Sequence, residues 1–352
     1  MDKASRIYIA GHTGLVGSSI LRKLQEGGFS NLVYKKSKEL DLRRQKDTED
    51  FFSSEKPDYV FLSAAKAGGI LANSTYPADF IYNNLSIALN VINTSYKSGV
   101  KKLLNLGSSC IYPKYAPQPL KEEYLLSGGL EPTNEAYSIA KIAAIKLCRY
   151  YNEQYGTDFI SVMPTNLYGH NDNYNLETAH VIPALIRKFH LAKLLRNKDF
   201  NSIIYDIKAR PLGFGLDAVI NLEDEKSIQG VLNKLGVFID HILLWGTGDV
   251  YREFLFADDL ADACVLLMNN YGYKDIGELI NIGSGKDVKL KDLAALIKDI
   301  VGFDGAIKHD TSKPDGTPKK LLDVSRMKTL GWEAKTELKE GIKIVYDKYQ
   351  RK

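Results

Sequence analysis

The feature that most constrains this chain is a glycine-rich run near its beginning, GHTGLVG at residues 11–17. It follows a short β-branched and aromatic segment, residues 6–10, and leads into residues 16–26, where apolar side chains have helical spacing. Glycines between a strand and a helix let the backbone turn tightly and approach a pyrophosphate at the helix N-terminus, where unpaired N–H groups favour anions. A purely structural turn is the alternative. The position of the run between a strand and a helix, near the start of the chain, favours a dinucleotide-binding unit.

The first half of the chain continues with the same alternation of strand-like and helix-like segments. Further strands are expected at 31–34, 59–64, 102–107 and 159–163, and further helices at 47–53, 79–98 and 133–155. This rhythm predicts an α/β fold with a Rossmann-type, doubly wound parallel sheet. After about residue 169 the pattern becomes mixed. We therefore expect a dinucleotide-binding domain at 1–170, to which segments near 254–285 return, and a smaller mixed α/β substrate domain within 171–352.

Composition excludes several broad classes of protein. The net charge of +4 comes from 47 basic and 43 acidic residues, which is too balanced for a nucleic-acid binder. Three cysteines without paired spacing argue against a disulfide framework. No apolar run approaches the ~20 residues that cross a bilayer. We expect a cytoplasmic protein with no nucleic-acid or membrane partner and no metal centre.

The end of the second expected strand indicates which dinucleotide binds. An acidic residue there would hold the ribose of NAD, whereas basic residues accommodate the additional phosphate of NADP. The sequence at residues 34–39 is YKKSKE, with lysines at 35, 36 and 38 and no acid at the immediate strand end. The pattern favours NADP(H), and a solvated lysine cluster on a turn is the alternative.

A possible catalytic set consists of Ser108, which follows a strand, and the pair Tyr137 and Lys141 in YSIAK. Spacing of i, i+4 on a helix places the tyrosine and lysine on one face. A nearby ammonium lowers the pKa of a phenol, which can then exchange a proton with a carbonyl or hydroxyl group. The alternative is a surface pair. Combined with the glycine run, the set predicts a nicotinamide-dependent oxidoreductase.

Several longer motifs resemble the GDP-L-fucose synthase family of extended short-chain dehydrogenases. They include IAGHTGLVGS, AAKAGGI, LGSSCIYPK, HVIPALIRKFH and SKPDGTPKKLLDVS, and the similarity covers most of the chain. The resemblance implies NADPH-dependent reduction of the C4 ketone of a GDP-linked 4-keto sugar after inversion at C3 and C5. It also implies a homodimer formed through the long helices expected at 79–98 and 133–155.

The same resemblance implies roles for individual residues. Ser108, Tyr137 and Lys141 match the reductase triad, while Cys110 and His180 match the base and the acid of epimerisation. The alternatives are that Cys110 is a buried, unreactive side chain and that His180 is a loop histidine without a catalytic role. The implied cofactor-binding residues are Gly11, Thr13, Gly14, Leu15, Val16, Gly17, Lys36, Ser37, Asp41, Leu42, Ala64, Ala65, Leu106, Tyr137, Lys141, Pro164, Asn166, Leu167 and His180. The implied substrate-binding residues are Ser109, Asn166, Lys188, Trp245, Arg252 and Asp315.

The sequence also departs from the family pattern. Ser37, Thr13 and Lys188 stand where the family tends to have arginine. An insertion of about forty residues is expected near 195–241, as a functional lid, an oligomer contact or a surface excursion. A changed sugar pocket favours an alternative function, a monofunctional C4 reductase of a GDP-4-keto-heptose in capsule or lipopolysaccharide synthesis. A non-catalytic NADP- or nucleotide-sugar-binding regulator is a further alternative.

Overall fold

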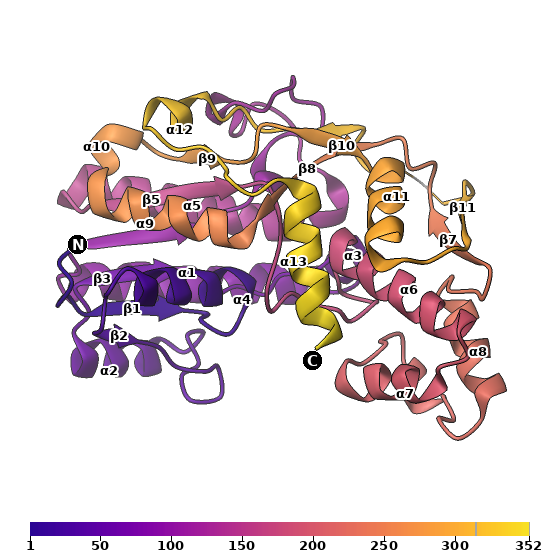
Figure 1. Cartoon of the computed structure of the whole chain (residues 1–352). Coiled ribbons are helices and arrows are strands. Elements are labelled where there is room, and N and C mark those ends of the chain that lie inside the picture. The colour runs from indigo at the N-terminus through magenta and orange to yellow at the C-terminus, as the bar shows by residue number, and fades with distance from the viewer. Residues whose placement is uncertain (314, 352) are drawn as a thin grey trace.

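The computed structural model describes residues 1–313 and 315–351, and its centre is a six-stranded sheet (Figure 1). All neighbouring strands in this sheet run parallel. Their spatial order is β2 (Leu32–Val33), β1 (Ile7–Ala10), β3 (Tyr59–Leu62), β4 (Lys102–Leu106), β5 (Phe159–Pro164) and β9 (Ile280–Ile282). The predicted Rossmann-type parallel sheet is confirmed, and the expected strands are found to within two residues at each end.

Helices cover both faces of this sheet because β1 is apolar on both sides. Ile7 and Ile9 belong to one buried cluster, whereas Tyr8 and Ala10 belong to another. Successive side chains of a strand point to opposite faces, so the two clusters lie on opposite sides. The first face carries α1 (Leu15–Glu26) and α9 (Ala257–Asn270), and the second carries α2 (Gln45–Glu55), α4 (Pro77–Lys97) and α5 (Glu135–Tyr155).

The second part of the chain contains two smaller sheets. In one, β8 (Tyr251–Phe256) pairs with β6 (Asn166–Tyr168), β10 (Asp287–Lys289) and β12 (Lys319–Lys320). In the other, β7 (His241–Trp245) runs parallel to β11 (Ala306–Asp310). The division of the chain into domains at residue 170 stays a prediction, although β9 joins the large sheet beside β5.

The remaining helices complete the two parts of the molecule. Short α-helices are α3 (Ile70–Thr75), α10 (Tyr273–Ile276) and α12 (Ser325–Thr329), and the 3-10 turns are η1 (Ser109–Ile111), η2 (Glu122–Tyr124), η3 (Pro132–Asn134) and η4 (Leu216–Ala218). The longer helices of the second part are α6 (Val181–Arg196), α7 (Phe200–Ala209), α8 (Glu225–Lys234), α11 (Leu290–Val301) and α13 (Leu338–Gln350). No helix in the described ranges is long and apolar enough to cross a membrane.

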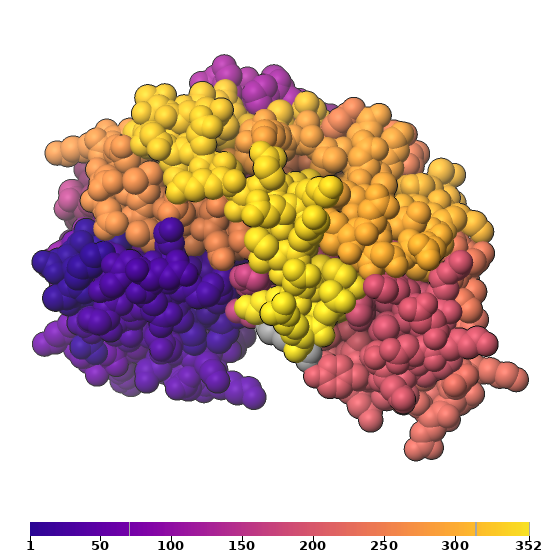
Figure 2. Space-filling view, viewed as in Figure 1, coloured from indigo at the N-terminus to yellow at the C-terminus, as the bar shows by residue number. Residues whose placement is uncertain are grey.

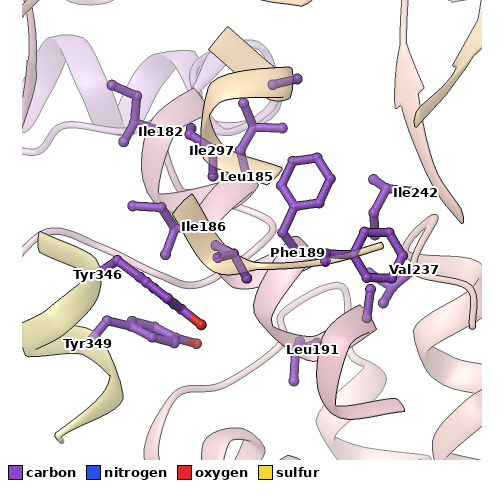
Figure 3. Close-up of a cluster of buried hydrophobic side chains, with 14 of the residues drawn as sticks. Ile182, Leu185, Ile186, Phe189, Leu191, Val237, Ile242, Ile297, Tyr346 and Tyr349 are labelled. Carbon is purple, nitrogen blue, oxygen red and sulfur yellow. The ribbon is translucent and has the colours of Figure 1, made fainter. Parts of the chain in front are cut away.

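Segment 195–241 contributes to the main apolar core of the second part. Ile203 of α7 and Leu232 of α8 are fully buried in the same cluster as Phe189 of α6. Figure 3 shows Phe189 facing Val237 and Ile242, with the two tyrosines of α13 on the other side of α6. Because its apolar side chains are part of a shared core, this segment is integrated into the fold.

A buried ionic network ties α7 to α6 and α13. Arg187 Nε and Arg210 Nη1 donate to the two carboxylate oxygens of Asp206, at 2.9 and 2.8 Å. The hydroxyl of Tyr349 donates to the same carboxylate. A buried charge is tolerated when it is paired and hydrogen-bonded, as it is here. In the space-filling view, an indentation lies beneath α13, between the amino-terminal part and the α7 region (Figure 2).

Candidate active site

The glycine run forms a tight cradle between β1 and α1. Gly11 has a φ of 87°, and a Cβ atom there would lie 2.8 Å from the backbone nitrogen of Ala64. A Cβ atom on Gly17 would lie 2.1 Å from the carbonyl oxygen of Gly11. Gly14 offers no side chain to cap α1, and the first turn holds no acidic residue. The cradle therefore presents backbone N–H groups to an anion and fits the pyrophosphate of a dinucleotide.

Lys36, which follows β2, lies near this cradle. The ring of His12 packs on that of Tyr34, with centroids 4.6 Å apart. Burial lowers the pKa of His12, and the charge of Lys36 lowers it further. Lys36 and Ser37 are exposed. A cation beside the glycine cradle suits the additional phosphate of NADP.

Other predicted cofactor residues gather at the carboxyl ends of the parallel strands, where this fold class binds ligands. They are Ala64 and Ala65 after β3, Leu106 in β4, Pro164 in β5, and Asn166 and Leu167 in β6. Leu42 is buried in the core, and Thr13 is exposed. The carboxylate of Asp41 accepts two hydrogen bonds from Arg43, which holds the pKa of that carboxyl at about 2.

The end of β4 and helix α5 bring the predicted triad together. Ser108 caps η1 and accepts the backbone N–H of Cys110 at 3.3 Å. Lys141 Nζ donates to the carbonyl oxygen of Leu106 at 2.7 Å and lies 5.7 Å from the centre of the Tyr137 ring. The three side chains of the triad thus share one corner at the carboxyl edge of the sheet, in which Lys141 is buried and Ser108 and Tyr137 are half-buried.

The electrostatics of this corner correct one expectation. Burial raises the pKa of Tyr137, the nearby Cys110 raises it further, and a hydrogen bond with Ser108 opposes the rise. Burial also lowers the pKa of Lys141 to about 8. The predicted lowering of the phenol pKa by the ammonium was wrong for the protein alone, because desolvation of the charged phenolate dominates. Tyr137 is therefore protonated at neutral pH, as a proton donor requires.

The two residues predicted for epimerisation have different surroundings. The Sγ atom of Cys110 receives hydrogen bonds from Asn134 Nδ2 and Lys320 Nζ, both at 3.4 Å. His180 caps the start of α6, and partial desolvation of its ring by the surrounding protein lowers the imidazole pKa. The loop that precedes His180 is held by the backbone N–H of Gly69, which donates to Thr178 at 3.0 Å.

Three predicted substrate residues gather around the β7–β8 turn. Asp315 accepts both the backbone N–H and the hydroxyl of Thr247, at 2.9 and 2.7 Å, and so holds the turn that follows Trp245. Trp245 itself is 65% exposed. Burial lowers the pKa of Arg252, while the charges of Asp315 and Cys110 oppose this, so Arg252 lies near both of them. An exposed aromatic ring and a cation suit a base and a diphosphate.

The other predicted substrate residues are more enclosed. Ser109 is buried within η1, and Asn166 Nδ2 donates to the carbonyl oxygen of Glu253 at 2.8 Å. Burial lowers the pKa of Lys188 to about 8. Sequence reasoning missed Lys320, although it lies in the quoted SKPDGTPKK motif. Lysines on exposed turns are common, and nothing local marked this one.

A cavity of about 500 Å³ lies beside loop 169–175, and no predicted site residue lines it. Its walls are loop 169–175, the end of α7 and residues 345–349 of α13. Across residues 1–313 and 315–351, no group of three or more histidine, cysteine, aspartate and glutamate side chains could hold a metal ion.

The sheet, the glycine cradle and the Ser–Tyr–Lys corner together define a dinucleotide-dependent oxidoreductase of the extended short-chain dehydrogenase class. Residues 7–283 match the NAD dependent epimerase/dehydratase family. The chain is 52% identical to GDP-L-fucose synthase 1 of Arabidopsis thaliana, over 99% of this chain and 94% of that protein. The chain belongs to that epimerase/dehydratase family and, within it, to the GDP-L-fucose synthase family.

Two solved structures are also similar over nearly the whole chain. A GDP-6-OMe-4-keto-L-xylo-heptose reductase from C. jejuni is 44% identical with a TM-score of 0.93, covering 100% of this chain and 99% of that one. A GDP-mannoheptose C4 reductase from Campylobacter jejuni with NADP bound is 43% identical with a TM-score of 0.87, over 99% of both chains. The insertion expected near 195–241 stays a prediction.

Proposed function

We propose that this protein uses NADPH to reduce the C4 ketone of a GDP-linked 4-keto sugar. The observation that carries the proposal is the half-buried corner in which Ser108, Tyr137 and Lys141 lie together, with Tyr137 as a protonated phenol. When bound, the nicotinamide supplies hydride to the carbonyl carbon. Tyr137 donates its proton to the carbonyl oxygen, Ser108 orients that oxygen, and the ammonium of Lys141 stabilises the phenolate that remains.

Both the cofactor and the substrate have support in the chain itself. Lys36 lies near the glycine cradle and suits the phosphate that distinguishes NADP from NAD. Trp245, Arg252 and Lys188 supply an aromatic ring and cations for a guanine base and a diphosphate. The relatives described above act, by their names, on GDP-linked sugars.

Epimerisation at C3 and C5 before reduction is the finer part of the proposal. Cys110 lies close enough to Tyr137 for its charge to raise the pKa of the phenol, which supports a role as the base for a C–H bond next to the ketone. His180 is the proposed acid. The second candidate function is C4 reduction of a GDP-4-keto-heptose in capsule or lipopolysaccharide synthesis, favoured by the similar Campylobacter structures. A non-catalytic regulator would not need the Ser–Tyr–Lys proton relay.

Incubation with NADPH and a panel of GDP-4-keto-hexoses and GDP-4-keto-heptoses in D₂O tests the proposal. Loss of NADPH absorbance with only one sugar class identifies the substrate. Deuterium at C3 or C5 of the product, detected by mass spectrometry, reports epimerisation. Turnover of an already epimerised substrate without label would leave a C4 reductase alone. No NADPH oxidation with any member would overturn the proposal.

We also infer a homodimer in a reducing, cytoplasmic compartment. Large apolar side chains are exposed along the packed pair α4 and α5, including Tyr82, Leu89, Ile139 and Tyr150. Exposed apolar patches of this kind mark protein interfaces. Cys110, Cys148 and Cys264 are all free thiols, which suits a reducing compartment.

A further inference from the structure

The thiol of Cys110 is surrounded by donors and cations that come from separate parts of the chain. Asn134 of η3 and Lys320 of β12 both place a nitrogen 3.4 Å from Sγ. β12 pairs with β8 so that Lys320 lies beside Arg252. Arg252 in turn experiences the charge of Cys110. Lys320 in contact with the sulfur and the charge of Arg252 nearby are arranged to favour a negative charge on it.

The other two cysteines of the chain show what burial does without such partners. Burial raises the pKa of Cys148 to about 12, and it raises the pKa of Cys264 as well. Burial acts in the same direction at Cys110. There, however, Lys320, Arg252 and a hydrogen bond with Ser108 outweigh it, and the pKa of the Cys110 thiol lies below its ordinary value.

We propose that Lys320 is the charge partner that keeps Cys110 as a thiolate and so equips the reductase site with a carbon base. Arg252 acts on the sulfur only through its charge, whereas Lys320 is also hydrogen-bonded to it at 3.4 Å, and no nearby anion in the described part of the chain neutralises this pair. Tyr137 is a neutral phenol, and Glu131, which is near Arg252, is paired with Lys114 at 3.0 Å. The inference rests on the proposed function only for the identity of the substrate, because the contact of Lys320 with the Cys110 sulfur needs no substrate.

The proton transfer that this arrangement permits is balanced without any further reactant. The thiolate of Cys110 takes the proton from a carbon next to the ketone, and the C–H electron pair moves into the enolate. Protonation of that carbon on its other face, by His180 as the proposed acid, restores the ketone with inverted configuration. Cys110 then returns its proton to solvent, and His180 takes one up, so that no electron is gained or lost overall.

The test measures the ionisation of Cys110 in the full-length protein. Thiolate absorbance in the far ultraviolet, taken as the difference between the wild type and Cys110→Ser, is followed against pH. The apparent pKa of the wild type should lie below the ~8.5 of a free cysteine. In Lys320→Met it should rise by about one unit or more, which lowers the thiolate population at neutral pH roughly tenfold. Lys320→Arg should restore most of the wild-type behaviour.

Lys319→Met is the matched control, because Lys319 is the neighbour of Lys320 on β12 but pairs with Asp287 at 3.0 Å. This variant should leave the Cys110 titration unchanged. Iodoacetamide labelling of Cys110 at several pH values provides a second readout of the same ionisation. A Cys110 titration in Lys320→Met that matches that of the wild type would overturn the inference.

The outcome is separable from that of the proposed function. NADPH oxidation with GDP-4-keto sugars tests reduction, whereas the titration of Cys110 needs neither cofactor nor substrate. If Lys320→Met shifts the titration and also abolishes deuterium exchange while reduction persists, Lys320 serves the carbon base alone. If no sugar is reduced but the titration shifts, the proposed function fails and the Lys320–Cys110 pairing stands.

Discussion

At the scale of single residues, the chemistry depends on which protons Tyr137, Lys141 and Cys110 hold at neutral pH. The phenol is neutral because a phenolate would be desolvated, and the ammonium of Lys141 is held by one backbone carbonyl in a buried position. Lys320 lies close enough to Cys110 to favour a thiolate. Each state follows from the contacts of the folded chain.

Removal of the phenol hydroxyl should abolish most of the reduction. In Tyr137→Phe the carbonyl oxygen loses its proton donor, and we expect a fall in kcat of ~10²- to 10⁴-fold. The Kd for NADPH, measured by fluorescence titration, should change little, because the phenol acts mainly in the chemical step. Near-normal turnover would contradict the role given to Tyr137.

The charge of Lys141 should appear in the pH dependence of reduction. Burial lowers its pKa to about 8, so the ammonium is present below this pH and is lost as the pH rises through it. The rate should therefore decline above about pH 8. Tyr137 cannot cause that decline, because its pKa is raised above 10. In Lys141→Arg the guanidinium stays charged, and the decline near pH 8 should disappear even if the rate is lower. A decline that persists in this variant would assign it to another group.

At the scale of elements, segment 195–241 supports the loop that carries His180. The carboxylate of Glu177 accepts the backbone N–H of Phe214 at 2.7 Å. Asp217 accepts the N–H groups of Leu212 and Gly213, at 2.8 and 2.9 Å, and so keeps the turn in shape. The turn after α7 is thereby attached to the loop between β6 and α6.

Gly213→Ala should disturb this attachment selectively. Gly213 has a φ of 85°, and a Cβ atom there would lie 2.6 Å from the Cβ of Glu177. We expect deuterium exchange at C3 and C5 to fall, because the loop shifts, while NADPH binding is retained. Gly215→Ala is the matched control, since its φ is 68° with nothing within 4 Å of the added carbon. Both variants should lose about 1–2 kcal/mol of unfolding free energy from backbone strain. Equal exchange rates in the two variants would show that the turn does not act on His180.

At the scale of the whole molecule, the pair α4 and α5 lies on the outside of the sheet opposite α1 and α9. Leu89→Asp places a charge in the middle of the exposed apolar surface of α4 and should convert the dimer to a monomer. Size-exclusion chromatography with light scattering measures the mass. Val219→Asp, at a similarly exposed position in segment 195–241, should leave the mass unchanged. A monomeric wild type would remove the dimer from the proposal.

The features that the sequence alone determined are local ones. The glycine run, the strand and helix periods and the Tyr137–Lys141 spacing depend on residues a few positions apart, and the structure has the corresponding elements. The position of Ser108 directly after a strand added it to this set, and resemblance to a family added Cys110, which lies on the same short turn. These features are predictable because backbone geometry sets the direction of neighbouring side chains.

What only the tertiary structure decided is which distant groups meet. Lys320 reaches Cys110 across 210 residues of chain, through the parallel pairing of β12 with β8. Asp315 reaches Thr247 in a comparable way, and Asp206 joins α7 to α6 and α13. The direction of the Tyr137 pKa shift also depended on burial, which no spacing reveals. Proximity, desolvation and charge pairing arise only when separate elements pack, because they depend on distances in space and not on positions along the chain.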